Sequence, residues 1–179
     1  QFIQKQPFAV VVDYAHTPDS LEAVYKALKG NQATSDPLLR VEDEASKQQV
    51  SRLICVLGAA GGGRDTWKRP KFGAIAAQYC DEIILTNEDP WDENPEEILN
   101  QIEAGILGNM KQATSDKRQV GSYKRIINRS EAIRYAVSLA KPGDTVVITG
   151  KGSEISMALA NGKKIPWSDT KEAREALQH

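Results

Sequence analysis

The sequence lacks the features that mark membrane, secreted and nucleic-acid-binding proteins. No apolar run approaches the roughly 18–20 residues that a membrane-spanning helix needs, and no signal peptide is evident. The formal net charge is −1, from 23 basic and 24 acidic residues, which gives no electrostatic basis for binding nucleic acid or an anionic membrane surface. We therefore expect a cytoplasmic globular protein without nucleic-acid or membrane partners.

Cysteine is scarce as well, since the chain has only two, Cys55 and Cys80. Both lie in or beside apolar segments, and neither has a second Cys or His at the spacing of a metal site. We predict that both are reduced core residues, with a disulfide or a metal site as the alternatives. No metal ligand is predicted in this chain.

The size and composition fit one domain. The chain has 179 residues, of which 40% are hydrophobic and 26% charged, enough for a sizeable core. It begins at Gln1 without a methionine, which we interpret as a piece of a longer protein. Residues 31–52 are polar and charged, and we expect a surface insertion there with a helical piece near 42–50. The prediction is one domain over 1–179, monomeric, with one insertion.

Apolar runs alternate with amphipathic patterns along the chain. The strands are predicted at residues 8–13, 53–57, 82–86, 124–127, 144–149 and 163–166. Helices are predicted over 18–30, 70–79 and 130–139, from residue 95 onward, and at the C-terminal end. Thr17, Ser130 and an Asp169–Glu172 capping box are the predicted N-terminal caps. This alternation predicts an α/β domain with a mainly parallel sheet.

Four predicted strands end in unusual sequences, which are DYAHTP, GAAGGGRD, TNEDPW and GKGSE. Ligands bind beyond the carboxyl ends of parallel strands, and all four sequences would lie along that one edge of the sheet. The opposite ends carry ordinary turns. The asymmetry favours a binding edge over four unrelated loops.

The charges in these sequences suggest what the edge binds. Gly61–Gly63, followed by Arg64, expose backbone N–H groups and a cation that suit a carboxylate or phosphate, although a solvated turn is the plainer alternative. Glu88 and Asp89 precede a proline and would either form only a turn or face the cationic corner with the opposite charge. An edge with both signs of charge would suit a zwitterion such as an amino acid. His16 could also be only an exposed loop histidine. The GKGSE segment could also be only a plain turn after a strand.

Taken together and in this order, the four stretches resemble the C-terminal domain of the Mur ligases. The matching segments are Asp13–Asp19, Gly61–Pro70, Glu88–Trp91 and Gly150–Glu154, and the resemblance runs from about Phe8 to Leu177 outside the insertion. It is closest to the branch that adds the third residue of the peptidoglycan stem peptide. The resemblance implies a Rossmann-like mixed sheet with helices on both faces.

The resemblance also implies roles for single residues. Asp13 would contact the ribose of ATP and His16 would lie near its phosphates. Arg64 would take the carboxylate of the incoming amino acid, and other amino-acid-contacting positions are occupied by Glu88, Asp89, Trp91, Gly150 and Glu154. No residue of this domain is assigned a catalytic role. ATP with Mg²⁺, UDP-N-acetylmuramoyl-dipeptide and an amino acid would be the ligands of the full-length enzyme, with Mg²⁺ held mainly by a central domain absent here.

The sequence departs from the family pattern mainly in the amino-acid pocket. Trp91 stands where the diaminopimelate-adding enzymes have arginine, and Gly63 and Ser153 replace an aspartate and a histidine. These changes favour an amino acid with a cationic side chain, then a neutral one, over meso-diaminopimelate. The alternative functions are a stand-alone nucleotide- or amino-acid-binding module and a cyanophycin- or folylpolyglutamate-type ligase domain.

Overall fold

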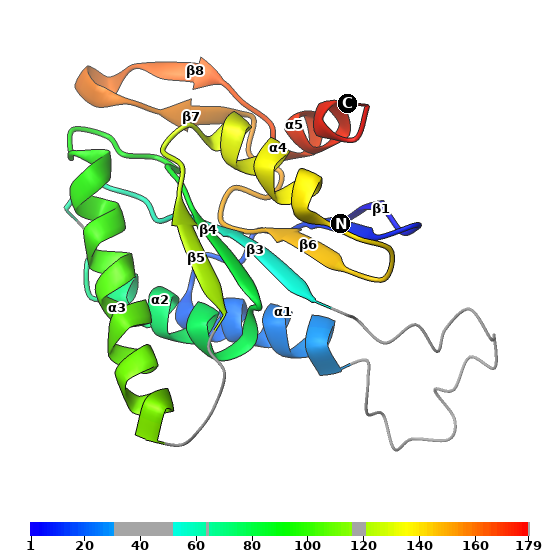
Figure 1. Cartoon of the computed structure of the whole chain (residues 1–179). Helices are drawn as coiled ribbons and strands as arrows, with labels where there is room; N and C mark the ends of the chain where they lie inside the picture. Colours follow the sequence, from blue (N-terminus) through cyan, green and yellow to red (C-terminus); the bar gives the residue numbers. More distant parts are fainter. Residues whose placement is uncertain (31–51, 64, 116–120, 179) are drawn as a thin grey trace.

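A six-stranded sheet forms the centre of the fold (Figure 1). The structure, a computed structural model, describes residues 1–30, 52–63, 65–115 and 121–178. The strands are β1 (Phe2–Gln4), β2 (Ala9–Val12), β3 (Leu53–Leu57), β4 (Glu82–Leu85), β5 (Ser122–Arg125) and β6 (Thr145–Ile148). They lie in the order β1-β2-β6-β3-β4-β5, and all neighbours are parallel except β1, which runs antiparallel to β2. The mixed, mainly parallel sheet is therefore confirmed.

Helices cover both faces of the sheet, as Figure 1 shows. One face carries α1 (Pro18–Gly30), α2 (Lys68–Tyr79) and α3 (Pro95–Ser115), and the other carries α4 (Arg129–Leu139) and α5 (Asp169–Ala176). A separate antiparallel pair, β7 (Ser156–Ala158) and β8 (Lys164–Pro166), is joined by the short 3₁₀ turn η3 (Ala160–Gly162). The Rossmann-like arrangement that the resemblance implied is confirmed.

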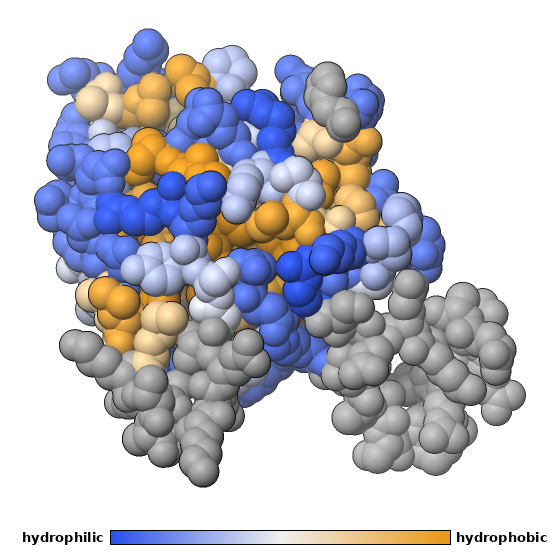
Figure 2. Space-filling model, in the orientation of Figure 1, coloured by the Kyte–Doolittle hydropathy of each residue, from blue (hydrophilic) through white to orange (hydrophobic). Residues whose placement is uncertain are grey.

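Alternation along each strand divides the core into two layers. Val11 packs toward α1–α3, whereas Val10 and Val12 pack toward α4 and α5, because successive side chains point to opposite faces of a sheet. All five residues of β3 are buried, as expected of a central strand covered on both sides. On the face seen in Figure 2, hydrophilic side chains cover most of the surface around smaller apolar areas.

Two glycines let α2 and α3 approach closely. A Cβ atom on Gly73 would lie 1.9 Å from the carbonyl oxygen of Ile102, and one on Gly105 would lie 1.8 Å from that of Pro70. Any larger residue would push the helices apart. This contact fixes the N-terminal end of α2, which lies at the carboxyl edge of the sheet.

Two of the three predicted helix caps are wrong. Thr17 is confirmed, since its hydroxyl accepts the Ser20 N–H. The helix α4, however, is capped by Asn128, whose side chain accepts the Glu131 N–H, because the helix begins one residue before Ser130. The helix α5 is capped by Ser168, since the Asp169 carboxylate is turned into the core.

The prediction of reduced cysteines is also wrong. Cys55 on β3 and Cys80 after α2 form a disulfide, with their Cα atoms 6.1 Å apart. The burial was predicted correctly, because the two residues are 0% and 3% exposed. The pairing was missed because 25 residues separate them in sequence, whereas the turn back from α2 brings Cys80 against β3.

The predicted strands and helices otherwise agree with the structure to within about two residues. The short strands β1 and β7 were not predicted, since three residues are too few to show a periodic pattern. The predicted insertion falls almost entirely outside the described residues, and so does the helical piece predicted near 42–50. No helix in the described ranges is long and apolar enough to cross a membrane.

Candidate functional site

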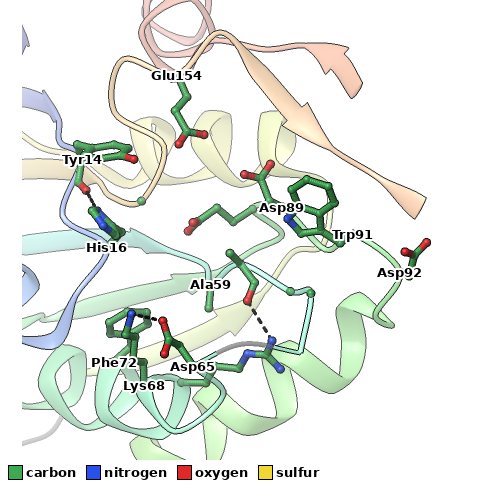
Figure 3. Close-up of a pocket in the computed structure, with 16 residues that line it drawn as sticks. Tyr14, His16, Ala59, Asp65, Lys68, Phe72, Asp89, Trp91, Asp92 and Glu154 are labelled. Atoms are coloured by element: carbon green, nitrogen blue, oxygen red, sulfur yellow. Dashed lines mark hydrogen bonds and ion pairs between the residues drawn. The ribbon is translucent and has the colours of Figure 1, made fainter. Parts of the chain in front are cut away.

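A cavity of about 560 Å³ lies at the carboxyl edge of the sheet, between the loops that follow β2, β3, β4 and β6 (Figure 3). Its walls include Tyr14 and His16 from the first loop, Gly61 and Gly62 from the second, Glu88, Asp89 and Trp91 from the third, and Gly150 and Glu154 from the fourth. The four unusual sequences thus meet at one edge. Of the eight predicted site residues, six line this cavity, Asp13 precedes the lining residue Tyr14 but does not line it, and Arg64 is not among the described residues.

The loop after β2 is held by local hydrogen bonds. One oxygen of the Asp13 carboxylate accepts the Ala15 N–H at 3.0 Å, a turn that aspartate favours. His16 Nδ1 donates to the Tyr14 carbonyl oxygen at 2.9 Å, because a carbonyl oxygen only accepts. The second Asp13 oxygen makes no hydrogen bond within the described residues, and it remains open to a hydroxyl group.

The glycine-rich loop after β3 lies directly against the loop after β4. The Gly61 N–H donates to the Asp89 carbonyl at 2.6 Å, and a Cβ on Gly61 would lie 2.0 Å from the Pro90 carbonyl oxygen. Gly62 and Gly63 both have positive φ angles, of 84° and 71°. Only glycine adopts these φ angles without strain, so the close approach of the two loops requires glycine at position 61, and the backbone path requires it at positions 62 and 63.

Glu88 is a buried carboxyl on the cavity wall, 7% exposed. Burial raises its pKa to about 7, against the opposing effect of the nearby cations Arg129 and Lys151. A Cβ on Gly150 would lie 2.1 Å from Glu88 Oε2, and the φ angle of 108° at this position also favours glycine, so a larger residue would displace this carboxyl. No described side chain or backbone group donates a hydrogen bond to it, which leaves it available to a donor brought by a ligand.

A buried lysine joins two of the predicted amino-acid residues. Lys151, whose side chain is fully buried, donates to Asp89 Oδ2 at 2.8 Å and to Glu154 Oε2 at 2.6 Å. The other Asp89 oxygen accepts the Ala158 N–H at 2.7 Å. Both oxygens of Asp89 are therefore engaged by the protein. Glu154 also raises the pKa of the Tyr14 hydroxyl across the cavity.

Sequence reasoning missed Lys151, although it lies within the quoted GKGSE segment. It also missed the pair formed by Arg69, which is 1% exposed, and Glu93 on the loop before α3. The only signal for the second pair was that Lys68 and Arg69 follow the glycine run. In the ranges that the structure describes, no group of three or more His, Cys, Asp or Glu residues is placed to hold a metal ion.

Known proteins resemble this chain over most of its length. A family model described as "Mur ligase, glutamate ligase domain" matches residues 1–152. The UDP-N-acetylmuramoyl-L-alanyl-D-glutamate–2,6-diaminopimelate ligase of Coxiella burnetii is 40% identical over 174 residues, 97% of this chain. The UDP-N-acetylmuramyl-tripeptide synthetase of Deinococcus radiodurans is 40% identical over 168 residues, 94% of this chain. The chain spans 29% of the length of each of these curated relatives.

Two solved structures superpose on most of this chain. A UDP-N-acetylmuramoyl-L-alanyl-D-glutamate–2,6-diaminopimelate ligase superposes with a TM-score of 0.76 at 32% identity, over 99% of this chain and 31% of that one. A murein peptide ligase from Psychrobacter arcticus, at a TM-score of 0.56 and 15% identity over 96% of this chain and 27% of that one, shares the fold. The chain therefore belongs to the Mur ligase family, in which it is the C-terminal domain.

Proposed function

We propose that this domain is part of an ATP-dependent ligase that adds the third amino acid to UDP-N-acetylmuramoyl-dipeptide, as a UDP-N-acetylmuramoyl-tripeptide synthetase does. The observation that carries the proposal is the cavity, where four loops bring carboxylates and cations together at one edge of the sheet. The names of relatives that are about 40% identical support the same reaction. The whole protein would act in the cytoplasm, as a monomer.

The domain would contribute to the reaction by positioning the incoming amino acid. ATP, with Mg²⁺, would supply the phosphoryl group that activates the substrate carboxylate. The neutral amine of the incoming amino acid then attacks the carbonyl carbon and phosphate leaves. The amine must be held within about 3–3.5 Å of that carbon with water kept out. The glycine-rich loop after β3 and the loop after β4 would hold the amino acid at this distance.

The nucleotide side of the site would be the loop after β2. The free oxygen of Asp13 fits a ribose hydroxyl, because a carboxylate accepts hydrogen bonds from hydroxyl groups. His16 lines the cavity nearby and would lie near the phosphates. The described residues offer no cluster for Mg²⁺, and we propose that other domains of the full-length protein hold it.

The amino-acid side would be formed by Arg64, Glu88, Trp91, Gly150 and Glu154. Arg64 would pair with the α-carboxylate. The buried carboxyl of Glu88 accepts no hydrogen bond from the described residues and fits an ammonium group. Asp89 would act indirectly, through its hydrogen bonds to Lys151 Nζ and the Ala158 N–H, because these two donors already bind both of its carboxylate oxygens.

We further propose that the amino acid carries a cationic side chain, lysine or ornithine, with a neutral one next. The names of several relatives include 2,6-diaminopimelate, whose distal carboxylate needs a cationic partner. The described Lys and Arg side chains on the cavity wall, Lys68 and Arg69, are already paired with Asp65 and Glu93. Trp91 offers an apolar ring and a single N–H.

The test is an assay of the purified full-length protein with UDP-N-acetylmuramoyl-dipeptide, ATP, Mg²⁺ and a panel of amino acids. We expect phosphate release and a product whose mass has grown by one residue, with lysine or ornithine used best. No ligation with any amino acid would overturn the function, and preferential use of meso-diaminopimelate would overturn only the choice of amino acid. The 179-residue domain alone should catalyse no ligation, since it has no P-loop lysine for the β- and γ-phosphates.

A further inference from the structure

Arg69, on the wall of the cavity, and Glu93 form a two-point ion pair. Arg69, in the first turn of α2, donates from Nη1 to Glu93 Oε2 at 2.8 Å and from Nη2 to Glu93 Oε1 at 3.1 Å. The arginine side chain is 1% exposed and that of the glutamate 28%. Parallel bonds between a guanidinium and a carboxylate fix the angle between the two groups as well as their distance. The pair therefore holds the start of α2 at a defined place relative to the loop after β4.

The same two side chains also bind the glycine-rich loop. Arg69 Nη2 donates to the Ala60 carbonyl at 3.0 Å, and Glu93 Oε1 accepts the Gly63 N–H. The loop is thus tied to the pair on both sides of Gly61 and Gly62. Both of these glycines line the cavity, and the Gly61 N–H is bound to the third loop through the Asp89 carbonyl.

Two residues near the pair hold a backbone conformation that they would not adopt freely. Asp65 and Trp91 have φ angles of 56° and 51°, in the left-handed region that favours glycine. Such conformations persist only where the surrounding contacts fix them, and they concentrate at functional sites. Trp91 lies two residues before Glu93, and Asp65 lies two residues after Gly63, so the pair restrains both segments.

We propose that Arg69 and Glu93 are positioning residues for the amino-acid side of the cavity. They act without touching the substrate, by fixing the glycine-rich loop after β3 and the loop after β4, which carries Trp91, relative to each other. The inference rests on the proposed function, because it names how that site is held in shape. In the described structure the pair makes no hydrogen bond to the loop of Asp13 and His16.

The inference predicts a separation between the two substrates. Glu93→Gln keeps the size of the side chain but removes its charge and one acceptor. In the full-length enzyme we expect the KM of the amino acid to rise by about tenfold or more, since small displacements of positioning groups have effects of this size. The KM of ATP should stay within about twofold, because the loop after β2 is not held by the pair.

The matched control is Glu103→Gln on α3. Glu103 also pairs with an arginine, Arg125 at 3.1 Å, and it does not line the cavity. This variant should leave both KM values unchanged. Glu93→Asp, which keeps the charge but has a shorter reach, should fall between wild type and Glu93→Gln, and it provides the result if Glu93→Gln does not fold.

A second measurement reports on position without relying on turnover. Amide hydrogen exchange of the segment 60–63 in the full-length protein should be faster in Glu93→Gln than in wild type, because the Gly63 N–H loses its carboxylate acceptor. Unchanged exchange, or an equal rise in both KM values, would overturn the inference. If the wild-type enzyme forms no product while exchange changes as expected, the proposed function fails and the positioning of the loop stands.

Discussion

The buried carboxyl of Glu88 should make the stability of the domain depend on pH in an unusual direction. Its pKa is raised from 4.5 to about 7 by burial, so the folded state binds a proton more tightly than the unfolded state does. The stabilisation from this proton is fully present below pH 4.5 and is lost as the pH rises toward 7. A pKa change of this size corresponds to about 3 kcal/mol, at about 1.4 kcal/mol for each pH unit.

Replacing Glu88 with glutamine removes this loss, because the amide has nearly the same shape and stays neutral. The Glu88→Gln variant and wild type should differ little in free energy of unfolding near pH 4.5. By pH 8 the variant should be more stable by about 3 kcal/mol. Urea denaturation of both proteins at several pH values between 4.5 and 8 measures this difference. The other titrating groups contribute equally to the free energy of unfolding of both proteins, so their contributions cancel in the difference.

The control is Glu96→Gln, since Glu96 is exposed at the start of α3 and pairs with Arg125 at the surface. The difference in free energy of unfolding between this variant and wild type should vary little over the same pH range. A difference between Glu88→Gln and wild type that is flat from pH 4.5 to 8 would refute the reasoning. In that case the pKa of Glu88 is the same in the folded and unfolded states, and the cations Arg129 and Lys151 offset the effect of its burial.

The remaining predictions concern the disulfide and the two sides of the cavity. Replacing Cys55 and Cys80 together by alanine should lower the free energy of unfolding by about 3 kcal/mol, because the bridge closes a loop across a separation of 25 residues. Reductant should lower the urea midpoint of wild type and leave that variant unchanged, and an insensitive wild type would contradict the pairing. In the full-length enzyme, Asp13→Ala should raise the KM of ATP more than that of the amino acid, and equal effects would remove Asp13 from the nucleotide side. Trp91→Arg should shift the ratio of kcat/KM toward meso-diaminopimelate, and no shift would show that another cation serves the distal carboxylate.

The location of the site could be predicted because it depends on the pattern of strands. Each apolar run was long enough to be recognised, and the polar sequence that followed it had to emerge at the same edge of a parallel sheet. His16, Glu88, Trp91 and Glu154 accordingly lie around one cavity. Glycines 61–63 were also informative, since the close approach of Gly61 to the Pro90 backbone and the positive φ angles of Gly62 and Gly63 both depend on a local property of the residue.

The partners of the buried charges could not be predicted in the same way. Lys151 and Asp89 are 62 residues apart in the sequence, and Arg69 and Glu93 are 24 apart. Each pair forms only because two different loops end at neighbouring positions of the folded sheet. No periodicity or local motif carries that information, and a single sequence provides no second example from which a pairing could be inferred.

Asp169 shows how a correct local rule gives a wrong result when a buried charge competes for the same side chain. An aspartate followed three residues later by a glutamate is a good capping box, yet the Asp169 carboxylate accepts hydrogen bonds from Arg129 at 2.7 and 2.8 Å instead. Arg129 is fully buried, and leaving it without a carboxylate would cost more than a helix cap contributes, about 3–5 kcal/mol against about 1 kcal/mol. Ser168 takes over the cap. The Arg129 guanidinium also donates to the carbonyls of Asn87 and Thr149, which lie just beyond β4 and β6 and directly before Glu88 and Gly150. The residue that sequence reasoning assigned to a helix end therefore supports the floor of the cavity.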